Sequence, residues 1–199
     1  DHERYMRSIA QADCILPVSE YSKTCYLDWA ESSGIDVPQI EVCLNGVQFG
    51  DKSAEIDERT LPEGVSSDFA LCVSTVEPRK NHLKLLEAWR NLLAEGEALP
   101  QLVLVGNAYS GFEELAESVD QICKDEKGVV WLKGVNDEDL EMLYARCRLT
   151  VFPSIAEGFG LPILESLWYG KPCLCASFGA MEEVAGGGGC VRVDMRYVE

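Results

Sequence analysis

From residue 69 onward, short and continuous apolar runs alternate with amphipathic stretches. The apolar runs are typical of parallel strands buried on both faces, and they lie at 69–75, 101–106, 129–134, 149–154 and 172–177. Helical patterns lie between them, at 81–96, 112–126, 137–147 and 161–170. This alternation predicts an α/β fold with a Rossmann-like, doubly wound parallel sheet.

The residues before this region carry a shorter set of elements. The expected elements are helices at 2–12 and after a serine cap at Ser19, and strands at 14–19 and 40–47. Residues 50–67 are polar and contain proline and glycine, which predicts a linker. We therefore predict a first segment at 1–49, that linker, and a main domain at 68–199.

Composition and charge narrow the classes of function. The 199 residues are 47% hydrophobic and 26% charged, as in ordinary globular proteins. The 34 acidic and 17 basic residues give a formal charge of −17, which argues against binding of nucleic acid. No apolar run approaches the ~18 residues of a membrane span and no signal peptide is recognisable, so we expect a cytoplasmic protein. The chain begins inside a helical pattern without methionine, which predicts a fragment.

Nine cysteines raise the question of a metal site. They form no Cys-x-x-Cys pair, and with only two histidines a zinc site would need thiolates from distant segments. We therefore expect no metal and interpret the cysteines as small buried residues in a reducing cytosol. Cys173 and Cys175 fit this interpretation, because their i, i+2 spacing places both on one face of a strand.

Polar, glycine-containing or charged segments follow three of the predicted strands. These segments are EPRKN (77–81), GNAYSG (106–111) and PSIAEGFG (153–160). In doubly wound sheets, ligands bind outside the carboxyl ends of the strands, where the strand order reverses. We therefore expect the three segments to converge on one ligand-binding rim.

The segment EGFGLPILE (157–165) combines two carboxylates with two glycines and a proline. Pro162 suits the first turn of a helix, and Gly158 and Gly160 let a ligand approach the backbone closely. The free N–H groups at such a helix start favour an anion, most naturally a phosphate.

Four charged side chains are candidates at this rim. Glu165, one turn into the predicted helix, can accept hydrogen bonds from a vicinal diol such as that of a ribose, or it only complements the helix dipole. Glu157 precedes the glycines and is expected on the other side of the phosphate, unless it is a solvated loop acid. Arg79 and Lys80 open the next predicted helix, where cations oppose the dipole, so a ligand role is favoured over a solvated basic pair.

Two further motifs have structural explanations. GNAYSG has the glycine spacing of a P-loop, but Phe112 and Glu113 stand where that motif needs Lys and Ser or Thr. Gly106 is interpreted either as a point of close backbone approach or as a plain sharp turn. The acidic run 137–139 resembles an Asp-x-Asp metal motif, but a cap at Asn136 followed by acids of the first helical turn explains it.

In combination, these motifs resemble those of the retaining GT-B glycosyltransferases of family 4. EPRKNH, then LVG, then the E-x7-E motif of EGFGLPILE and then SLWYGKP occur in that order within residues 69–194. Residues 12–47 resemble the end of that family's N-terminal domain. The resemblance implies that 68–199 is a GT-B C-terminal, nucleotide-sugar-binding domain, incomplete at its C-terminus. It also implies that 1–49 is a partial tail of the N-terminal, acceptor-binding domain.

The resemblance also implies roles for the candidate residues. Arg79 and Lys80 would hold the diphosphate of the donor and Glu157 would lie at its sugar, so these three are the expected catalytic residues. Glu165 would accept hydrogen bonds from the ribose hydroxyls. The expected donor-binding residues are Glu165, Gly158, Phe159, Gly160, Leu161, Gly106 and Val135. No metal is implied, because cations and a helix N-terminus would stabilise the leaving diphosphate.

The expected activity is transfer of a hexose, with retention of configuration, from a nucleoside diphosphate to a glycan or lipid-linked acceptor in polysaccharide biosynthesis. EPRKNH favours mannose from GDP-mannose. Regions outside the chain would bind most of the acceptor and could contact a membrane peripherally, so the fragment alone is expected to be inactive. The alternatives are a GT-B epimerase or phosphorylase, which would lack this combination of E-x7-E and Arg-Lys, and a non-catalytic nucleotide-sugar-binding module.

Overall fold

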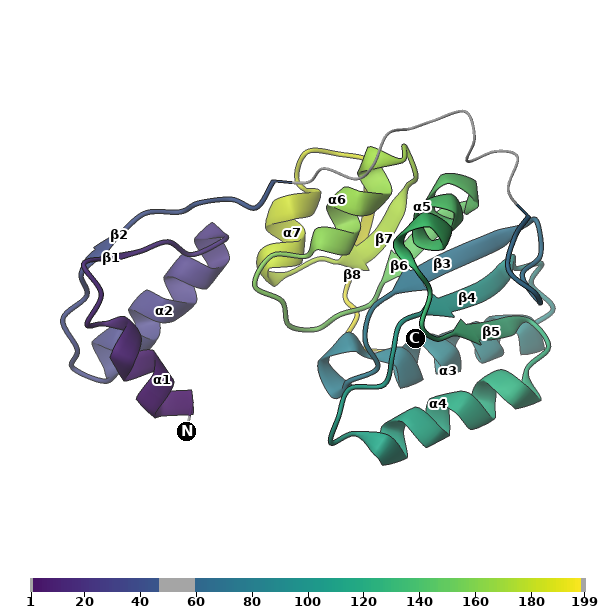
Figure 1. The fold of residues 1–199 in the computed structure, drawn as a ribbon, viewed down its shortest axis with the longest axis horizontal. Helices are drawn as coiled ribbons and strands as arrows, with labels where there is room; N and C mark the ends of the chain where they lie inside the picture. Colours follow the sequence, from purple (N-terminus) through teal and green to yellow (C-terminus); the bar gives the residue numbers. More distant parts are fainter. Residues whose placement is uncertain (1, 47–59, 198–199) are drawn as a thin grey trace.

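The computed structural model describes residues 2–46 and 60–197, and from residue 60 onward the chain forms a parallel sheet covered by helices on both faces (Figure 1). The strands of this sheet are β3 (Phe69–Val73), β4 (Gln101–Val105), β5 (Val129–Leu132), β6 (Leu149–Phe152), β7 (Cys173–Ala176) and β8 (Cys190–Val193). The helices are η2 (Pro78–Lys80, a 3-10 turn), α3 (His82–Ala94), α4 (Glu113–Asp125), α5 (Asp137–Arg146), α6 (Leu161–Trp168) and α7 (Gly179–Ala185).

The strand order confirms the predicted doubly wound sheet. The six strands run in the order β5-β4-β3-β6-β7-β8, and every neighbouring pair is parallel. The chain first builds outward from β3 to β5, and then returns to the other side of β3 with β6. The order therefore reverses between β3 and β6, which makes this junction the switch point of the sheet.

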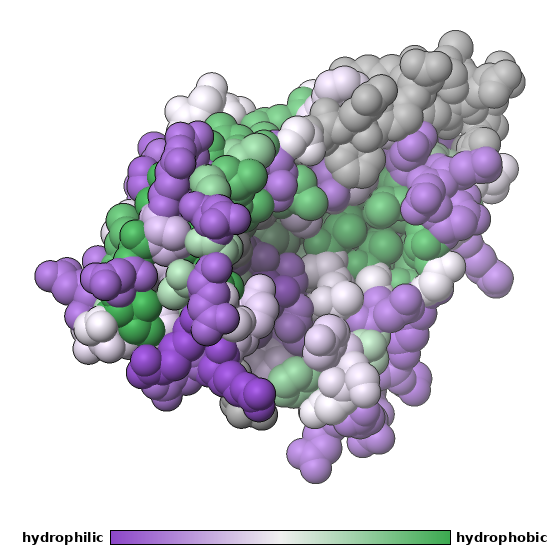
Figure 2. All heavy atoms as spheres, turned by 60° about the vertical axis from the view of Figure 1, so that its left-hand side comes forward, coloured by the Kyte–Doolittle hydropathy of each residue, from purple (hydrophilic) through white to green (hydrophobic). Residues whose placement is uncertain are grey.

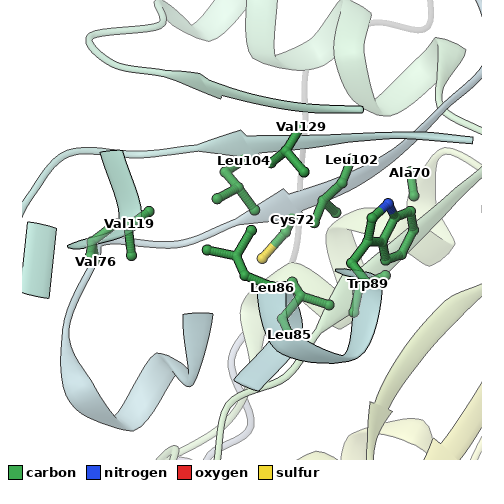
Figure 3. Packing of buried hydrophobic residues seen from close by; sticks show 11 residues of the cluster. Ala70, Cys72, Val76, Leu85, Leu86, Trp89, Leu102, Leu104, Val119 and Val129 are labelled. Atoms are coloured by element: carbon green, nitrogen blue, oxygen red, sulfur yellow. The ribbon is translucent and has the colours of Figure 1, made fainter. Parts of the chain in front are cut away.

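Side chains of β3 point alternately to the two faces of the sheet, which explains why its sequence is apolar throughout. Ala70 and Cys72 pack against α3 and α4, in the cluster drawn in Figure 3. Phe69 and Leu71 pack on the opposite face against Leu143 and other residues of α5. The helices α6 and α7 cover the remaining strands on that second face, around Cys173, Cys175 and Met181.

The first segment, residues 2–46, has shorter strands than its apolar runs predict. It consists of α1 (His2–Ile9), β1 (Cys14–Ile15), α2 (Glu20–Ser32) and β2 (Gln39–Ile40). The strands predicted at 14–19 and 40–47 shrink to two residues each, because β1 and β2 pair only with each other among the described residues. The predicted cap is confirmed, since the Ser19 hydroxyl accepts a hydrogen bond from the N–H of Ser22 at 3.0 Å. Val47 and residues 50–59 of the expected linker lie outside the described residues.

Helix α7 was not predicted from the sequence. It has only seven residues, and it begins at Gly179, which lies at φ +67°. A short helix that starts with a glycine and is followed by GGGG lacks the usual signals of a helix start and a long apolar periodicity.

The cysteines divide by their place in the fold. Cys72, Cys147, Cys173 and Cys175 are buried in the main domain, as predicted, with Cys173 and Cys175 on one face of β7. Cys14, Cys25 and Cys43 are exposed, so the prediction of burial is wrong for these three. The thin first segment offers them no second layer to pack against.

The face shown in Figure 2 carries many hydrophilic side chains around smaller hydrophobic areas, in keeping with the strong net negative charge. Within residues 2–46 and 60–197, no helix is both long and apolar enough to cross a membrane.

We predict that Gly106→Ala destabilises the fold by about 2–4 kcal/mol. Gly106 lies at φ +143°, and a Cβ atom there would stand 2.1 Å from the carbonyl oxygen of Ser74. Urea unfolding measures the effect. Gly128→Ala is the matched control, because its Cβ would meet only Leu93, at 3.8 Å. Equal stability of the two variants would contradict the prediction.

Candidate functional site

The loops that follow β3 and β6 lie side by side at the switch point of the sheet. The first loop carries Arg79 and Lys80 on η2, and the second carries Glu157 and leads into α6. A backbone hydrogen bond from the N–H of Ile155 to the carbonyl of Arg79, at 2.8 Å, joins the two loops. The sheet therefore brings together two segments that are separated by more than 70 residues of sequence, at the edge where doubly wound folds bind ligands.

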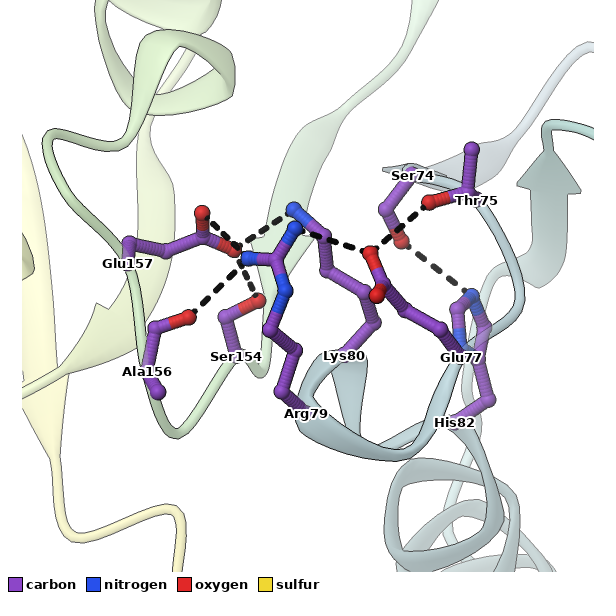
Figure 4. A network of polar contacts seen from close by, with 9 residues as sticks. All are labelled: Ser74, Thr75, Glu77, Arg79, Lys80, His82, Ser154, Ala156 and Glu157. Atoms are coloured by element: carbon purple, nitrogen blue, oxygen red, sulfur yellow. Dashed lines mark hydrogen bonds and ion pairs between the residues drawn. The ribbon is translucent and has the colours of Figure 1, made fainter. Parts of the chain in front are cut away.

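Glu157 is the centre of a polar network at this junction (Figure 4). Its carboxylate lies 2.7 Å from Nη1 of Arg79 and 2.5 Å from Nζ of Lys80. It also accepts a hydrogen bond of 2.6 Å from the Ser154 hydroxyl. Glu77 binds the other terminal nitrogen of Arg79 at 2.8 Å, so two carboxylates hold this guanidinium. Both predicted cations and the predicted loop acid thus meet in one cluster.

The charged forms of Glu157 and Arg79 are favoured by their partners. Burial by itself raises the pKa of the Glu157 carboxyl, but hydrogen bonds from Lys80, Ser154 and Arg79 hold this pKa below its ordinary value. Burial likewise lowers the pKa of Arg79, and the carboxylates of Glu157 and Glu77 more than offset this effect. The Lys80 residue is only 8% exposed, while the side chain of Arg79 is 41% exposed. A ligand can therefore reach Arg79 directly.

The cations do not open α3, contrary to the sequence-based expectation. They lie in the separate turn η2, and Asn81, at φ +61°, separates this turn from α3. The argument from an unfavourable helix dipole is therefore wrong. What holds Lys80 at this position is pairing with Glu157, reinforced by the ring of Phe152, whose centroid lies 5.2 Å from Nζ.

Next to the network, His82 is neutral at ordinary pH. Burial, together with the nearby charge of Lys80, lowers the pKa of His82 to about 4. Its Nε2 atom lies 3.2 Å from the Ser74 hydroxyl. This contact joins the side chain of the residue after β3 to that of the first residue of α3.

Glu165 lies one turn into α6 and is partly buried beneath the rim. The hydroxyl of Tyr144, on α5, donates a hydrogen bond to its Oε2 atom. Burial raises the pKa of Glu165, whereas this hydrogen bond and the charge of Lys80 act in the opposite direction. Tyr144 is itself held by stacking on Tyr169, with ring centroids 5.8 Å apart. The carboxylate is therefore oriented from below by a second helix.

The start of α6 has the predicted geometry of a glycine-rich turn that leads into a helix. Gly160 is the cap at φ +108°, and Pro162 lies in the first turn. The side chain of Phe159 is buried, so this residue can offer a ligand only its backbone. Leu161 is 40% exposed at the first helical position. In this turn Pro162 has no N–H, and the N–H of Ile163 donates to the carbonyl of Gly160 at 3.0 Å, so the anion site expected at this helix start stays a prediction.

The two remaining donor-binding candidates lie at the same edge but outside the network. Gly106 packs against the backbone of Ser74, so its close approach is to the protein's own chain. Val135 is partly buried against the α5 side of the sheet. A hydrogen bond of 3.0 Å from the N–H of Gly134 to the side chain of Asn107 joins the loops after β4 and β5.

The acidic run 137–139 is explained by helix capping. The side chain of Asn136 accepts a hydrogen bond of 2.8 Å from the N–H of Asp139, as the cap of α5. Across residues 2–46 and 60–197, no group of three or more His, Cys, Asp or Glu side chains is arranged to hold a metal ion.

Several residues of the site could not be selected from the sequence. Glu77 lies two positions before Arg79, and Ser154 lies three positions before Glu157. Only their places in the two loops indicated a role. Tyr144 comes from a different helix, α5, and no short-range sequence signal links it to Glu165. An open cavity of about 420 Å³ adjoins the network, and residues of four segments line it: Tyr21, Arg79, Ile155, Ala156, Glu157, Gly158, Phe178, Gly179 and Met181.

Most of the chain matches one known protein family. The profile of the family described as glycosyl transferases group 1 matches residues 53–191. The chain belongs to this family. The matched range includes the polar network around Glu157 and the start of α6.

Curated relatives of this glycosyltransferase chain include bacterial mannosyltransferases. O-antigen chain mannosyltransferase B of Escherichia coli is 42% identical over 125 residues, covering 62% of this chain and 32% of the relative. The serotype-specific mannosyltransferase WbdA of Escherichia coli is 35% identical over 165 residues, covering 78% of this chain and 20% of the relative. The chain thus spans between a fifth and a third of the length of these two relatives.

Solved structures of longer chains contain the same fold. Sucrose-phosphate synthase from Thermosynechococcus elongatus matches with a TM-score of 0.76 and 19% identity, over 100% of this chain and 50% of that chain. HepE of Anabaena, solved in complex with UDP and glucose, matches with a TM-score of 0.68 and 24% identity, over 91% of this chain and 50% of that chain. The predicted GT-B fold is confirmed.

We predict that Tyr144→Phe raises the pKa of Glu165 further, because the variant removes a hydrogen bond that favours the ionised carboxylate. Titration of the Glu165 carboxyl carbon by NMR measures this shift. Loss of a buried hydrogen bond to a charged group also costs about 1.5–3 kcal/mol of stability. Tyr26→Phe, at a buried tyrosine on α2, is the control and leaves the Glu165 titration unchanged. An unaltered pKa in Tyr144→Phe would contradict the assignment.

Proposed function

We propose that the protein containing this chain transfers mannose from GDP-mannose, with retention of configuration, to a glycan or lipid-linked acceptor. The observation that carries the proposal is the meeting of Arg79, Lys80 and Glu157 at the switch point beside the start of α6. The names of the relatives support the choice of mannose, because two proteins at 35–42% identity are mannosyltransferases of Escherichia coli. Their O-antigen and serotype names also favour a role in polysaccharide synthesis.

In this proposal the diphosphate of the donor binds to Arg79 and Lys80. The exposed guanidinium of Arg79 and the backbone N–H groups at the start of α6 would offer hydrogen bonds to phosphate oxygens. The incoming negative charge competes with Glu157 for the two cations and releases its carboxylate toward the sugar hydroxyls. Glu165, held by Tyr144, accepts hydrogen bonds from the ribose diol.

The same groups would promote departure of the diphosphate. Negative charge grows on the leaving oxygen as the bond to the sugar breaks, and a preorganised donor in such a site contributes about 10²–10³ in rate. Attack from the same face lets the departing diphosphate accept the proton of the acceptor hydroxyl. Positive charge from Arg79, Lys80 and the helix start replaces a metal ion in this scheme.

Calorimetry with GDP-mannose, UDP-glucose and ADP-glucose tests the donor assignment on this chain. We expect GDP-mannose to bind most tightly, and its affinity to be the same in EDTA as in Mg²⁺. Preference for a UDP or ADP sugar would overturn the choice of GDP-mannose, and strict dependence on a divalent cation would overturn the metal-free scheme. Transfer by the complete protein, with NMR of the product's anomeric configuration, tests retention.

We predict that the two glutamates of the E-x7-E motif separate by ligand. Glu165→Ala weakens binding of GDP and of GDP-mannose alike, by about 1.5–3 kcal/mol, because both ligands contain the ribose. Glu157→Gln frees the two cations from a carboxylate, so GDP binds equally well or more tightly, while GDP-mannose loses a sugar contact. Calorimetry measures the dissociation constant of GDP-mannose divided by that of GDP, and we expect this ratio to rise only in Glu157→Gln. A ratio that changes equally in both variants would show that the roles are not divided in this way.

A further inference from the structure

Helix α2, in the first segment, is tied to the loop that carries Glu157. The hydroxyls of Ser19 and Ser22 donate hydrogen bonds of 2.7 and 2.9 Å to the carbonyl oxygen of Gly158. These contacts join residues that are 139 and 136 positions apart in the sequence. Ser19 is fully buried, so its hydroxyl meets Gly158 without competition from solvent.

A second contact fixes the same end of α2. The carboxylate of Glu183, on α7, accepts hydrogen bonds of 3.0 Å from the N–H groups of Glu20 and Tyr21. The N–H of Ser22 is bound by the Ser19 hydroxyl. The first three N–H groups of α2 therefore all have acceptors, and a negative charge lies at the positive end of the helix dipole. The start of α2 is fixed against α7 as well as against Gly158.

The direction of the Gly158 carbonyl determines the direction of the next N–H group. A trans peptide is planar, and its C=O and N–H bonds point in opposite directions. There is no cis peptide bond among the described residues. Because the carbonyl of Gly158 points toward α2, the N–H of Phe159 points away from α2. Glycine has broad backbone freedom, so the peptide could rotate without these two hydroxyls.

We propose that Ser19 and Ser22 are positioning residues that hold the Gly158 carbonyl and thereby aim the Phe159 N–H at the sugar diphosphate of the donor. The inference rests on the proposed function, since it takes the loop from Glu157 to α6 as the donor contact. It extends the site to a segment that the sequence assigns to the other domain. Donor binding would then depend on α2 remaining attached to the donor domain.

Ser22→Ala is the sharpest test, because Ser19 also caps α2 and its loss would weaken the helix itself. We expect Ser22→Ala to weaken GDP-mannose binding about three- to tenfold, the range for one hydrogen bond, with guanosine binding unchanged. Ser22→Thr keeps a hydroxyl and restores the affinity. Ser32→Ala is the matched control, because the Ser32 hydroxyl donates a hydrogen bond within α2, to the carbonyl of Trp29 at 2.8 Å.

Calorimetry with GDP-mannose and competition NMR with guanosine supply the readouts, and thermal unfolding shows whether each variant is folded. The proposal is overturned if Ser22→Ala binds GDP-mannose as tightly as Ser32→Ala. It is also overturned if GDP-mannose and guanosine affinities fall together, since that pattern marks a general loss of structure. Failure of the unaltered chain to bind any sugar nucleotide would instead refute the proposed function.

Discussion

The buried carboxylate of Glu157, shared by Arg79 and Lys80, holds the candidate site together. A lysine that is 8% exposed would be destabilising without an opposite charge, because removal of an ion from water costs several kcal/mol. Glu157 offsets this cost and is offset in return, since burial alone would favour its protonated form. The loops after β3 and β6 therefore cannot separate without leaving a buried charge unpaired. The Ile155–Arg79 backbone bond reinforces the same junction.

This constraint also accounts for the chemistry that the site can support. The two cations are already oriented and partly removed from water before any ligand arrives, which is the condition under which electrostatic stabilisation is most effective. A bound diphosphate would carry more negative charge than the Glu157 carboxylate and could replace it as the partner of the two cations. The sheet supplies the place for this exchange, because its strand order reverses between β3 and β6, and doubly wound sheets bind ligands outside the carboxyl ends of strands at such a switch point.

The helices around the junction orient two groups outside the charge network, the Glu165 carboxylate and the Gly158 carbonyl. Tyr144 on α5 orients Glu165 on α6, and the stack on Tyr169 holds Tyr144. Helix α2 binds the backbone of the loop through Gly158. Groups from α2, from α5 and from the loop after β3 thus all contact one short segment, EGFGLPILE. The family assignment and the fold agree with this concentration of contacts at the carboxyl edge of the sheet.

The sequence by itself determined the class of the fold and predicted the position of the candidate site along the chain. Continuous apolar runs such as 69–75 and the intervening helical patterns are local signals, and the rule that ligands bind at strand ends converted them into an expected rim. Helix starts at Ser19, Asn136 and Pro162 were likewise readable from short-range capping chemistry.

Only the tertiary structure decided which side chains touch. Glu157 pairs with Lys80, 77 residues away, and Ser19 reaches Gly158 across 139 residues, and no local pattern encodes either distance. The exposed cysteines of the first segment and the seven-residue helix α7 were mispredicted or missed for the same reason. In short helices and strands the local sequence preference contributes little stability, so packing against distant parts of the chain decides whether they form.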